Sequence, residues 1–398
     1  MDAFLNHAEL RELAKRRLPR AVFEYIDRGT EDEAGLRHNR QAFDAVRIRP
    51  RVLAGGGTRS QAVTLFGQAC DMPIIAAPTA CAGLVRFRGE VELAKAAAAN
   101  KLPFCAALEA INALEDIVEA SQGNVWFQVY VWQDEELMNA LLARAWSLGV
   151  RTLVVTLDSP VASKREYNLR NGFGMPFRFS PRNVCDAALH PRWAFGVLGR
   201  YLASGSVPSY ANYPAEHRDT IFASRKPLAY QDDLGWTHMR WLRDQWKGKL
   251  VLKGILHPDD AVLACELGAD GIVVSNHGGR TFDSAVAPIE VLPEIVRAVG
   301  DGTTILADSS VRRGSDVLKL IAAGAKAVMV GRMLLYGTAV GGMAGASQAI
   351  GMLRSEIDSA LAMSGCKDIR DVDASLLSGA AHPSNAVCRS AQLDGPAQ

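Results

Sequence analysis

The sequence predicts an α/β protein of the (β/α)8, or TIM, barrel class. One pattern occurs three times: a small residue or glycine closes a helix, a short apolar run follows, and polar residues come next. The pattern ends at Asp158 in LGVRTLVVTLD, at His277 in LGADGIVVSNH and at Arg332 in AGAKAVMVGR. Glycine suits the left-handed conformation that ends a helix. An unbroken apolar run suits a parallel strand that is covered on both faces.

Five further segments have the same character, which brings the number of expected strands to eight. They are Ile74–Ala80, Pro103–Ala110, Val125–Trp132, Leu250–Ile255 and Thr304–Ser310. Helical patterns lie between the strands, for example over Glu90–Asn100 and His257–Gly268. Eight alternations of strand and helix are typical of a closed barrel. An open doubly wound sheet is the alternative, and it is disfavoured because no GxGxxG follows an early strand.

Two parts of the chain lie outside this repeat. The first 70 residues contain a helical start and an irregular lead-in, and residues from about Phe173 to Trp236 form a long insertion after the fourth strand. Connections of that length usually have a function of their own. We expect a single domain over residues 1–378 and a disordered tail, rich in Ala, Ser and Pro, over residues 379–398.

The amino-acid composition indicates which classes of binding partner and which cellular compartment to expect. The formal net charge is +1, so nothing in it indicates nucleic acid as a partner. The 7 cysteines are scattered and form no CxxC pair, which favours reduced thiols in a cytoplasmic protein over disulfides or a metal site. The amphipathic, charged N-terminus lacks the apolar core of a signal peptide, and no apolar run reaches membrane-spanning length.

Polar residues follow every expected strand, and the carboxyl ends of barrel strands meet at one mouth, where barrel enzymes have their active sites. Burying so many polar groups without partners would be costly, so we expect a polar ligand there. The residues in question are Pro78, Thr79, Ala80, Gln128, Tyr130, Thr156, Asp158, Lys253, Ser275, His277, Arg280, Asp308, Arg312, Gly331 and Arg332.

The ring of polar residues fits flavin mononucleotide (FMN). Arg312 and Arg332 follow the seventh and eighth strands, where barrels commonly hold a phosphate. Two guanidinium groups with backbone N–H donors suit a dianion. Lys253 directs a fixed positive charge toward the barrel centre. Gln128, Thr156 and Ser275 offer the neutral hydrogen bonds that a flat heteroaromatic ring uses.

A second group of residues predicts proton transfer and carboxylate binding. His277 is placed to act as a general base, and Asp158 could stabilise the imidazolium that forms. Arg280 is three residues beyond His277, so it could bind a substrate carboxylate, and Arg165 could add a second guanidinium from the following loop. Tyr130 could hydrogen-bond the substrate hydroxyl or carboxylate. The glycines after His277 let the chain turn, so that the base and the clamp face one small ligand.

Several motifs resemble those of the FMN-dependent 2-hydroxy-acid oxidase and dehydrogenase family. They are SNHGGR, DSSVRRGSDVLK, APTA, WFQVYVW and the N-terminal LPRAVFEYIDRGTEDE. The family includes glycolate oxidase, lactate oxidase, L-lactate dehydrogenase and (S)-mandelate dehydrogenase. The resemblance extends from about Leu5 to Ser378. RNGF and LHPRW are most similar to the branch of mandelate and bacterial lactate dehydrogenases.

The resemblance implies oxidation of an L-2-hydroxy acid, lactate- or mandelate-like, to the 2-oxo acid. His277 is then the base with Asp158 behind it, and Lys253 stabilises negative charge on the reduced flavin. Tyr25, whose role rests on the resemblance alone, completes the substrate pocket with Arg165, Arg280, Tyr130 and Glu109. The FMN site is implied to contain Pro78, Thr79, Ala80, Gln128, Thr156, Lys253, Ser275, Asp308, Ser309, Ser310, Arg312, Gly331 and Arg332. We expect O2 or a quinone as the electron acceptor, and a homotetramer.

Three positions depart from the family pattern. Ser310 stands where a glycine usually lets the backbone approach phosphate, so its side chain either crowds the site or adds a donor. Ala107 replaces a serine beside the flavin. Glu109 stands where relatives have tryptophan or a small residue, and a carboxylate is unusual beside an anionic substrate. It could pair with Arg165, point away from the site, or select a substrate that has a cationic group.

Alternatives remain for the insertion and for the function. The segment RWAFGVLGRYLASGS places Trp193, Phe195, Val197 and Leu198 among arginines. It predicts either peripheral contact with the inner membrane face or a packed lid or oligomer contact. A barrel isomerase or reductase that uses FMN or a phosphorylated substrate would not need His277. A non-catalytic ligand-binding relative is the third function considered.

Overall fold

Eight parallel strands close into a barrel in the computed structural model, which describes residues 4–54 and 57–378. Each strand lies beside its neighbour in the chain, and the last pairs with the first, with Val328 opposite Ile74. The strands are β4 (Ile74–Ala76), β5 (Phe104–Ala107), β6 (Val125–Val129), β7 (Thr152–Thr156), β8 (Lys249–Ile255), β9 (Gly271–Val274), β10 (Thr304–Ala307) and β11 (Ala327–Val330).

These are the eight strands predicted from the sequence, so the (β/α)8 barrel is confirmed and the open sheet is not the fold. Every residue of β6 and β7 is buried, as expected for strands covered by the barrel core inside and by helices outside. The predicted segments extend beyond several strand ends. Most of the polar residues that follow the apolar runs belong to the loops at the mouth, whereas Gln128, Thr156 and Lys253 lie within β6, β7 and β8.

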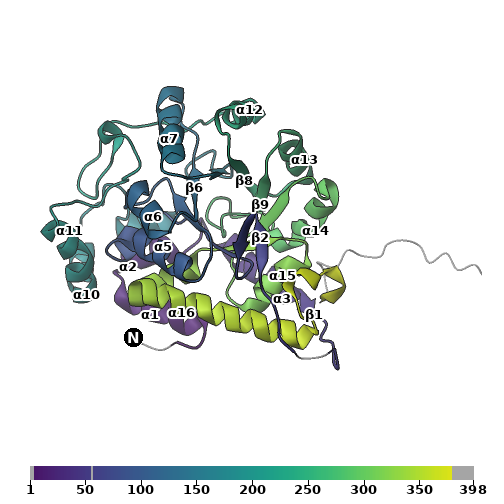
Figure 1. The fold of residues 1–398 in the computed structure, drawn as a ribbon. Helices are drawn as coiled ribbons and strands as arrows, with labels where there is room; N and C mark the ends of the chain where they lie inside the picture. The colour runs from purple at the N-terminus through teal and green to yellow at the C-terminus, as the bar shows by residue number, and fades with distance from the viewer. Residues whose placement is uncertain (1–3, 55–56, 379–398) are drawn as a thin grey trace, which may run out of the picture.

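Helices surround the barrel on its outer face (Figure 1). Asp134 caps the helix between β6 and β7 by accepting a hydrogen bond from Leu137 N, and His257 caps the helix after β8. The helices that follow the barrel strands are α4 (Ala82–Val85), α5 (Gly89–Ala99), α6 (Leu114–Ala120), α7 (Glu135–Ser147), α13 (Pro258–Glu266), α14 (Pro288–Val299), α15 (Gly314–Ala322) and α16 (Arg332–Ser364).

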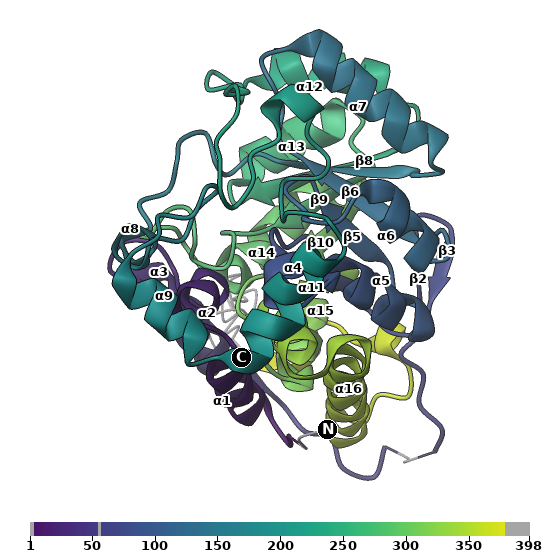
Figure 2. The ribbon, with the colours of Figure 1, turned by 90° about the vertical axis from the view of Figure 1, so that its left-hand side faces the viewer.

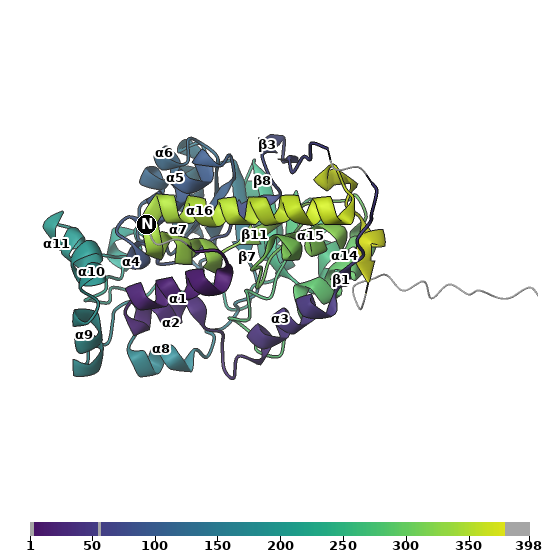
Figure 3. The same cartoon turned by 90° about the horizontal axis from the view of Figure 1, so that it is seen from below.

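The lead-in to the barrel is helical, as predicted, and its hairpin closes the end opposite the mouth. It contains α1 (His7–Arg17), α2 (Arg20–Asp27), α3 (Ala34–Ala45), β1 (Arg47–Ile48), β2 (Val63–Leu65) and β3 (Gln68–Cys70). Phe66, in the turn between β2 and β3, packs on Trp126 and lies close to Gly271, both near the start of a barrel strand. Figure 3 shows α1 and α2 beside α16, on one side of the barrel.

The insertion between β7 and β8 contains several short helices. They are α8 (Glu166–Asn171), α9 (Pro181–Ala188), α10 (Pro191–Trp193), η1 (Ala194–Gly199), α11 (Arg200–Ala203), η2 (Ala215–His217) and α12 (Trp236–Gln245). Figure 1 shows α10 and α11 on the left, whereas α12 lies at the top near α7, as it does in Figure 2. Trp193 Nε1 donates to Leu84 O at 2.7 Å, and Tyr201 Oη accepts from Arg88 N. The expected membrane-facing surface is therefore wrong for Trp193 and Val197, which are buried, whereas Phe195 is 77% exposed.

After β11 the chain forms α16, then the short turns η3 (Ile369–Asp371) and η4 (Ala374–Leu376), and returns in β12 (Leu377–Ser378) to pair with β1. The tail predicted over 379–398 lies outside the described residues, and the domain limit at residue 378 stays a prediction.

Helix α16 contains a break that lets its two halves touch. Gly342 has φ of +59°, and the residues on either side of the break pack together. A Cβ at Gly345 would lie 2.1 Å from Gly337 O, so only glycine permits this approach. A Cβ at Gly351, farther along the same helix, would meet nothing within 4 Å.

We predict that Gly345→Ala lowers the free energy of unfolding by about 1–3 kcal/mol, because the added methyl group forces the two halves of α16 apart. The measurement is the midpoint of urea unfolding followed by circular dichroism. Gly351→Ala is the matched control and should leave the midpoint unchanged or raise it slightly, since alanine favours the helix. Equal midpoints for the two variants would contradict the packing argument.

Candidate active site

A cavity of about 520 Å³ opens at the carboxyl ends of the barrel strands. This volume lies within the range of cofactor and small-ligand sites. Of the predicted site residues, only Asp158 and Ser275 are not part of the cavity wall. The predicted residues that line it are Tyr25, Pro78, Thr79, Ala80, Ala107, Glu109, Gln128, Tyr130, Thr156, Arg165, Lys253, His277, Arg280, Asp308, Ser309, Ser310, Arg312, Gly331 and Arg332.

His277 and Asp158 form a buried pair behind this wall. His277 Nδ1 lies 2.9 Å from Asp158 Oδ1. Since an ionised carboxylate can only accept, Nδ1 carries the hydrogen and Nε2 is left with its lone pair. His277, Gly278 and Gly279 all have positive φ, which turns the chain sharply after β9 and presents the imidazole to the cavity.

The strand between them makes the pairing possible. Asp158 follows β7 and His277 follows β9, with β8 in between. Gly254 of β8 has φ of +108° at an irregularity in the strand pairing, and a Cβ there would lie 2.6 Å from Asp158 Cβ. The missing side chain at Gly254 therefore gives Asp158 the space that it occupies beside the imidazole.

Burial and neighbouring charges set the protonation states of the pair. Burial lowers the pKa of His277, an effect that Asp158 opposes and Lys253 reinforces. Burial alone would raise the pKa of Asp158, but His277 and Lys253 bring it below its ordinary value. A neutral imidazole beside a carboxylate follows from this, which is the state that a general base needs.

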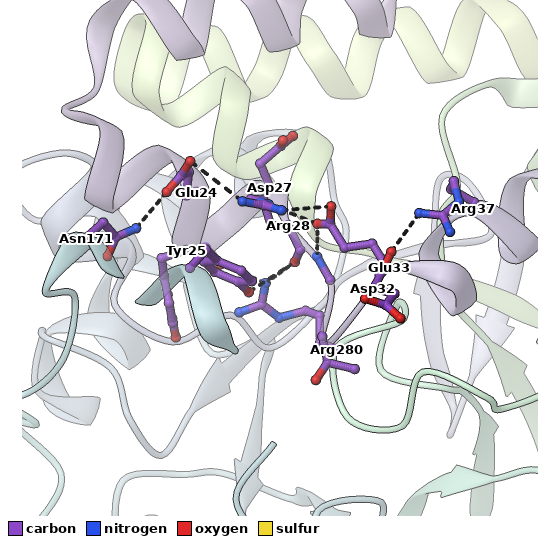
Figure 4. A network of polar contacts seen from close by, with 12 residues as sticks. Glu24, Tyr25, Asp27, Arg28, Asp32, Glu33, Arg37, Asn171 and Arg280 are labelled. Carbon is purple, nitrogen blue, oxygen red and sulfur yellow. Dashed lines mark hydrogen bonds and ion pairs between the residues drawn. The ribbon is translucent and has the colours of Figure 1, made fainter. Parts of the chain in front are cut away.

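Two arginines lie on the same wall without a carboxylate partner among the described residues. Arg280 Nη1 donates to Tyr25 O at 2.7 Å and to Arg28 O at 3.0 Å, as Figure 4 shows. Arg165 Nε lies 3.4 Å from Arg280 O. Burial and the charge of Arg165 lower the pKa of Arg280 to about 10, so it remains a cation at neutral pH. The two positive charges suit a carboxylate ligand.

Helix α2 orients both Arg280 and Arg332. The last carbonyls of a helix have no partner within it and attract cations. Arg332 Nε donates to Ile26 O at 3.1 Å and its Nη2 to Arg28 O at 3.3 Å. Arg332 therefore uses part of its guanidinium on backbone acceptors, whereas the sequence assigned it to a phosphate alone.

The outer end of the cavity has the features of a phosphate site. The Arg312 guanidinium forms no hydrogen bond with the described residues, and burial, with the charge of Arg40, lowers its pKa. Ser309 Oγ donates to Asp308 Oδ1 at 2.8 Å and accepts from Gly278 N at 3.1 Å. Ser310 has φ of +61°, and its buried Oγ has no partner. Ser310 lines the cavity, and a buried hydroxyl without a partner at its wall indicates a missing hydrogen-bond partner such as a ligand oxygen.

The inner part of the cavity has the polar groups expected around a flavin ring. Lys253 Nζ donates to Ser275 Oγ at 2.8 Å and lies 3.2 Å from Asp308 Oδ2. Burial would lower the pKa of Lys253, but Asp308 and Asp158 raise it, so the side chain stays an ammonium. Ser275 is fully buried and also accepts from His277 N, so it holds other site residues in place.

Gln128 Nε2 donates to Thr156 Oγ1 at 3.0 Å, which fixes the amide at the cavity wall. A fixed ammonium, an oriented amide, an orphaned hydroxyl and a guanidinium without a protein partner match the ring and the phosphate of FMN. The residues present therefore fit this cofactor.

The sequence did not predict the part of the cavity that comes from outside the barrel. His7, Arg11 and Asp27 of the lead-in and Tyr336 of α16 line the phosphate end. Arg11 forms two hydrogen bonds of 2.6 Å with Asp27, which also accepts one from Tyr336 Oη at 2.7 Å. Burial and the nearby Arg312 lower the pKa of His7 to about 4. In the sequence these residues belong to ordinary amphipathic helices.

Glu109 points into the cavity and forms no ion pair with Arg165. Two of the three interpretations of this residue, pairing with Arg165 and pointing away, are therefore wrong. Tyr230 Oη donates to Glu109 Oε1 at 2.7 Å. Tyr230 belongs to the insertion, and no sequence pattern connected it with the site.

Comparisons with known proteins agree with this geometry. The family model described as FMN-dependent dehydrogenase matches residues 14–379. L-lactate dehydrogenase of Bartonella tribocorum (strain CIP 105476 / IBS 506) is 39% identical over 92% of this chain and 95% of its own length. (S)-Mandelate dehydrogenase of Pseudomonas putida is 37% identical over 92% and 91%.

A solved structure, described as the monotopic membrane protein (S)-mandelate dehydrogenase, has a TM-score of 0.87 and 34% identity, and the match covers 95% of this chain and all of the other. Both relatives cover more than nine tenths of the chain, and the family model covers every cavity residue named above except His7 and Arg11, which precede its match. The chain thus belongs to the FMN-dependent 2-hydroxy-acid oxidase and dehydrogenase family, and it is an oxidoreductase whose cofactor is FMN.

Proposed function

We propose that this protein oxidises an L-2-hydroxy acid, lactate- or mandelate-like, to the corresponding 2-oxo acid. One observation carries the proposal: a His–Asp pair and two arginines without carboxylate partners meet at a cavity that fits FMN. The similarity to an L-lactate dehydrogenase and to (S)-mandelate dehydrogenase supports this substrate class. O2 or a quinone is the proposed final acceptor. The homotetramer and the cytoplasmic location stay predictions.

In this proposal each residue of the cavity wall has a task. Arg165 and Arg280 bind the substrate carboxylate, and Tyr25 and Tyr130 complete its pocket. His277 Nε2 takes a proton from the substrate, and Asp158 stabilises the resulting imidazolium through Nδ1.

FMN, when bound, accepts the two electrons. Lys253 is held by Asp308 and Ser275 and keeps a positive charge in the inner part of the cavity, where it would offset the negative charge that arrives there.

We predict that His277→Asn slows substrate-dependent bleaching of the flavin by about 10²-fold or more, because the base is lost. The measurement is anaerobic stopped-flow absorbance with lactate, glycolate and mandelate. The flavin spectrum of the variant before mixing is the control and should match that of the wild type. Bleaching at the wild-type rate would contradict the assignment of His277 as the base. A yellow wild-type protein that no hydroxy acid bleaches would favour the isomerase or reductase alternative.

The pH dependence follows from the same pair. The base must be neutral, so kcat/KM rises with pH through the pKa of His277, with a midpoint below 6.5 because burial lowers that pKa. Asp158→Asn should move the midpoint to lower pH, since the carboxylate that stabilises the imidazolium is removed. A midpoint that moves upward in Asp158→Asn would contradict the argument.

A further prediction concerns cofactor binding. Arg312→Gln should weaken FMN binding by about tenfold or more, because a guanidinium facing the phosphate end is lost. The dissociation constant is measured by titrating apoprotein with FMN and following flavin fluorescence. Arg313→Gln is the matched control: Arg313 is the next residue, but its guanidinium pairs with Glu356 and does not line the cavity. Equal weakening in both variants would argue against a phosphate at Arg312.

We also propose peripheral membrane contact through the helices α9–α11. Their exposed apolar side chains include Val184, Leu189, Phe195 and Leu202. No helix among residues 4–54 and 57–378 has the length and apolarity needed to cross a membrane. A surface of exposed apolar residues near arginines is typical of interfacial binding, and a relative in this family is described as a monotopic membrane protein.

The double variant Phe195→Ser/Leu202→Ser should lose most of its binding to vesicles that contain phosphatidylglycerol, because the apolar residues that enter the lipid interface are removed. Co-sedimentation of the holoenzyme measures this. Met363→Ser, which changes an equally exposed residue at the end of α16, should bind like the wild type. Wild-type protein that stays in the supernatant would rule out membrane contact.

A further inference from the structure

The cavity wall contains a carboxylate that the proposed reaction does not use and that forms no ion pair with the described residues. Glu109 follows β5 and lines the same cavity as His277 and Arg165. Its Oε1 accepts the hydrogen bond from Tyr230 Oη. Its Oε2 accepts no hydrogen bond from residues 4–54 and 57–378, and this oxygen is not buried. Because Glu109 lines the cavity, Oε2 is open to it.

Apart from Arg312 and Arg332 at the phosphate end, charged groups of the cavity wall lack an ion-pair partner among the described residues at two places. The other carboxylates in its wall, Glu12, Asp27 and Asp308, each form an ion pair with a described residue. Arg165 and Arg280 form none, and neither does Glu109 within that part of the chain. A substrate carboxylate would neutralise the arginines and leave the charge of Glu109 without a partner. A ligand with charges of both signs would satisfy both places.

Glu109 interacts electrostatically with residues of the proposed substrate pocket. Burial raises the pKa of the Tyr130 hydroxyl, Glu109 and Asp158 raise it further, and Arg165 lowers it. Arg165 also acts electrostatically on Glu109 and on His277. Glu109, His277 and Arg165 line one cavity. Tyr230, which donates to Glu109, packs on the ring of Tyr130, so a small molecule that contacts Tyr130 in this cavity lies near Glu109.

The carboxylate is held by a rigid support. Tyr230 Oη is hydrogen-bonded to Tyr213 Oη as well as to Glu109, and its ring packs on Tyr130 with centroids 5.1 Å apart. The segment around Tyr230 pairs with the chain after β6, with Trp132 opposite Tyr230. Burial raises the pKa of Tyr230, so the hydroxyl stays a donor and fixes one oxygen of Glu109.

We propose that Glu109 selects 2-hydroxy acids whose short side chain ends in a protonated amino group, with the ammonium bound at Oε2 and the carboxylate at Arg165 and Arg280. This rests on the proposed function and names its substrate class. Burial raises the pKa of Glu109, and an ammonium beside it offsets that burial by stabilising the ionised carboxylate. A purely apolar side chain of the same shape offers no such compensation.

Isosteric substrates provide the test. 3-Amino-2-hydroxypropanoate has the shape of 2-hydroxybutanoate, and 4-amino-2-hydroxybutanoate has that of 2-hydroxypentanoate. The holoenzyme is mixed anaerobically with each, and the second-order rate constant of flavin bleaching is compared within each pair. We expect the wild type to favour the amino compound of at least one pair by about tenfold or more, because a hydrogen bond between two charged groups forms.

Glu109→Gln keeps the shape and removes the charge, so within each pair the ratio of the rate constant of the amino compound to that of the neutral compound should fall to about one. Tyr230→Phe should reduce the preference, because Glu109 loses its fixed hydrogen bond. The control is Glu119→Gln, on the exposed side of α6, which should keep the wild-type preference.

A binding measurement separates this inference from the proposed reaction. 3-Aminopropanoate and butanoate lack the hydroxyl and cannot be oxidised at that position, so calorimetry with the holoenzyme compares only their affinities. Tighter binding of 3-aminopropanoate that disappears in Glu109→Gln supports the site even if no hydroxy acid bleaches the flavin, an outcome that would overturn only the proposed function. Equal affinities and equal bleaching rates within each pair in the wild type would overturn the inference and leave the proposed function intact.

Discussion

The buried contact between Asp158 and His277 is the interaction on which the rest of the site depends. Two strands that are not neighbours contribute the pair, so the intervening strand must leave space for it, and it does so at Gly254. Ser275 supports the same arrangement because its hydroxyl accepts hydrogen bonds from the backbone N–H of His277 and from Lys253 Nζ. Lys253 also forms an ion pair with Asp308. The carboxylates of Asp158 and Asp308 and the ammonium of Lys253 are buried charges, so each needs its partner. Removal of one partner would leave a buried charge whose desolvation nothing compensates.

The N-terminal helices complete the site, although they lie outside the barrel. The carboxyl end of α2 accepts hydrogen bonds from Arg280 and Arg332, and its Asp27 joins Arg11 to Tyr336. The barrel alone would leave these guanidinium groups without fixed positions. Since α2 also packs beside α16, the stability of the lead-in and the geometry of the carboxylate clamp are coupled (Figures 3 and 4).

Among the described residues, several polar groups of the cavity lack a partner of opposite charge or a hydrogen bond. They are the guanidinium groups of Arg165, Arg280 and Arg312, the hydroxyl of Ser310 and Oε2 of Glu109. Arg332 is held by backbone carbonyls, and the other carboxylates of the wall form ion pairs. Ser310 adopts the left-handed backbone that glycine usually supplies, which costs conformational energy, and its orphaned hydroxyl gives a physical reason for accepting that strain.

The sequence by itself determined the barrel, its eight strands and most of the barrel residues that line the mouth, because strand burial and a glycine at the end of a helix are local patterns. It also placed His277, Arg280 and Lys253 at strand ends, where parallel strands bring side chains together whatever the intervening helices contain. Only the tertiary structure decided that Ser275 points inward, that Arg332 binds α2, and that His7, Arg11, Tyr336 and Tyr230 belong to the site. Those contacts join segments that can lie about 300 residues apart, for example Arg332 and Ile26 at a separation of 306 positions, and no local pattern carries such a pairing.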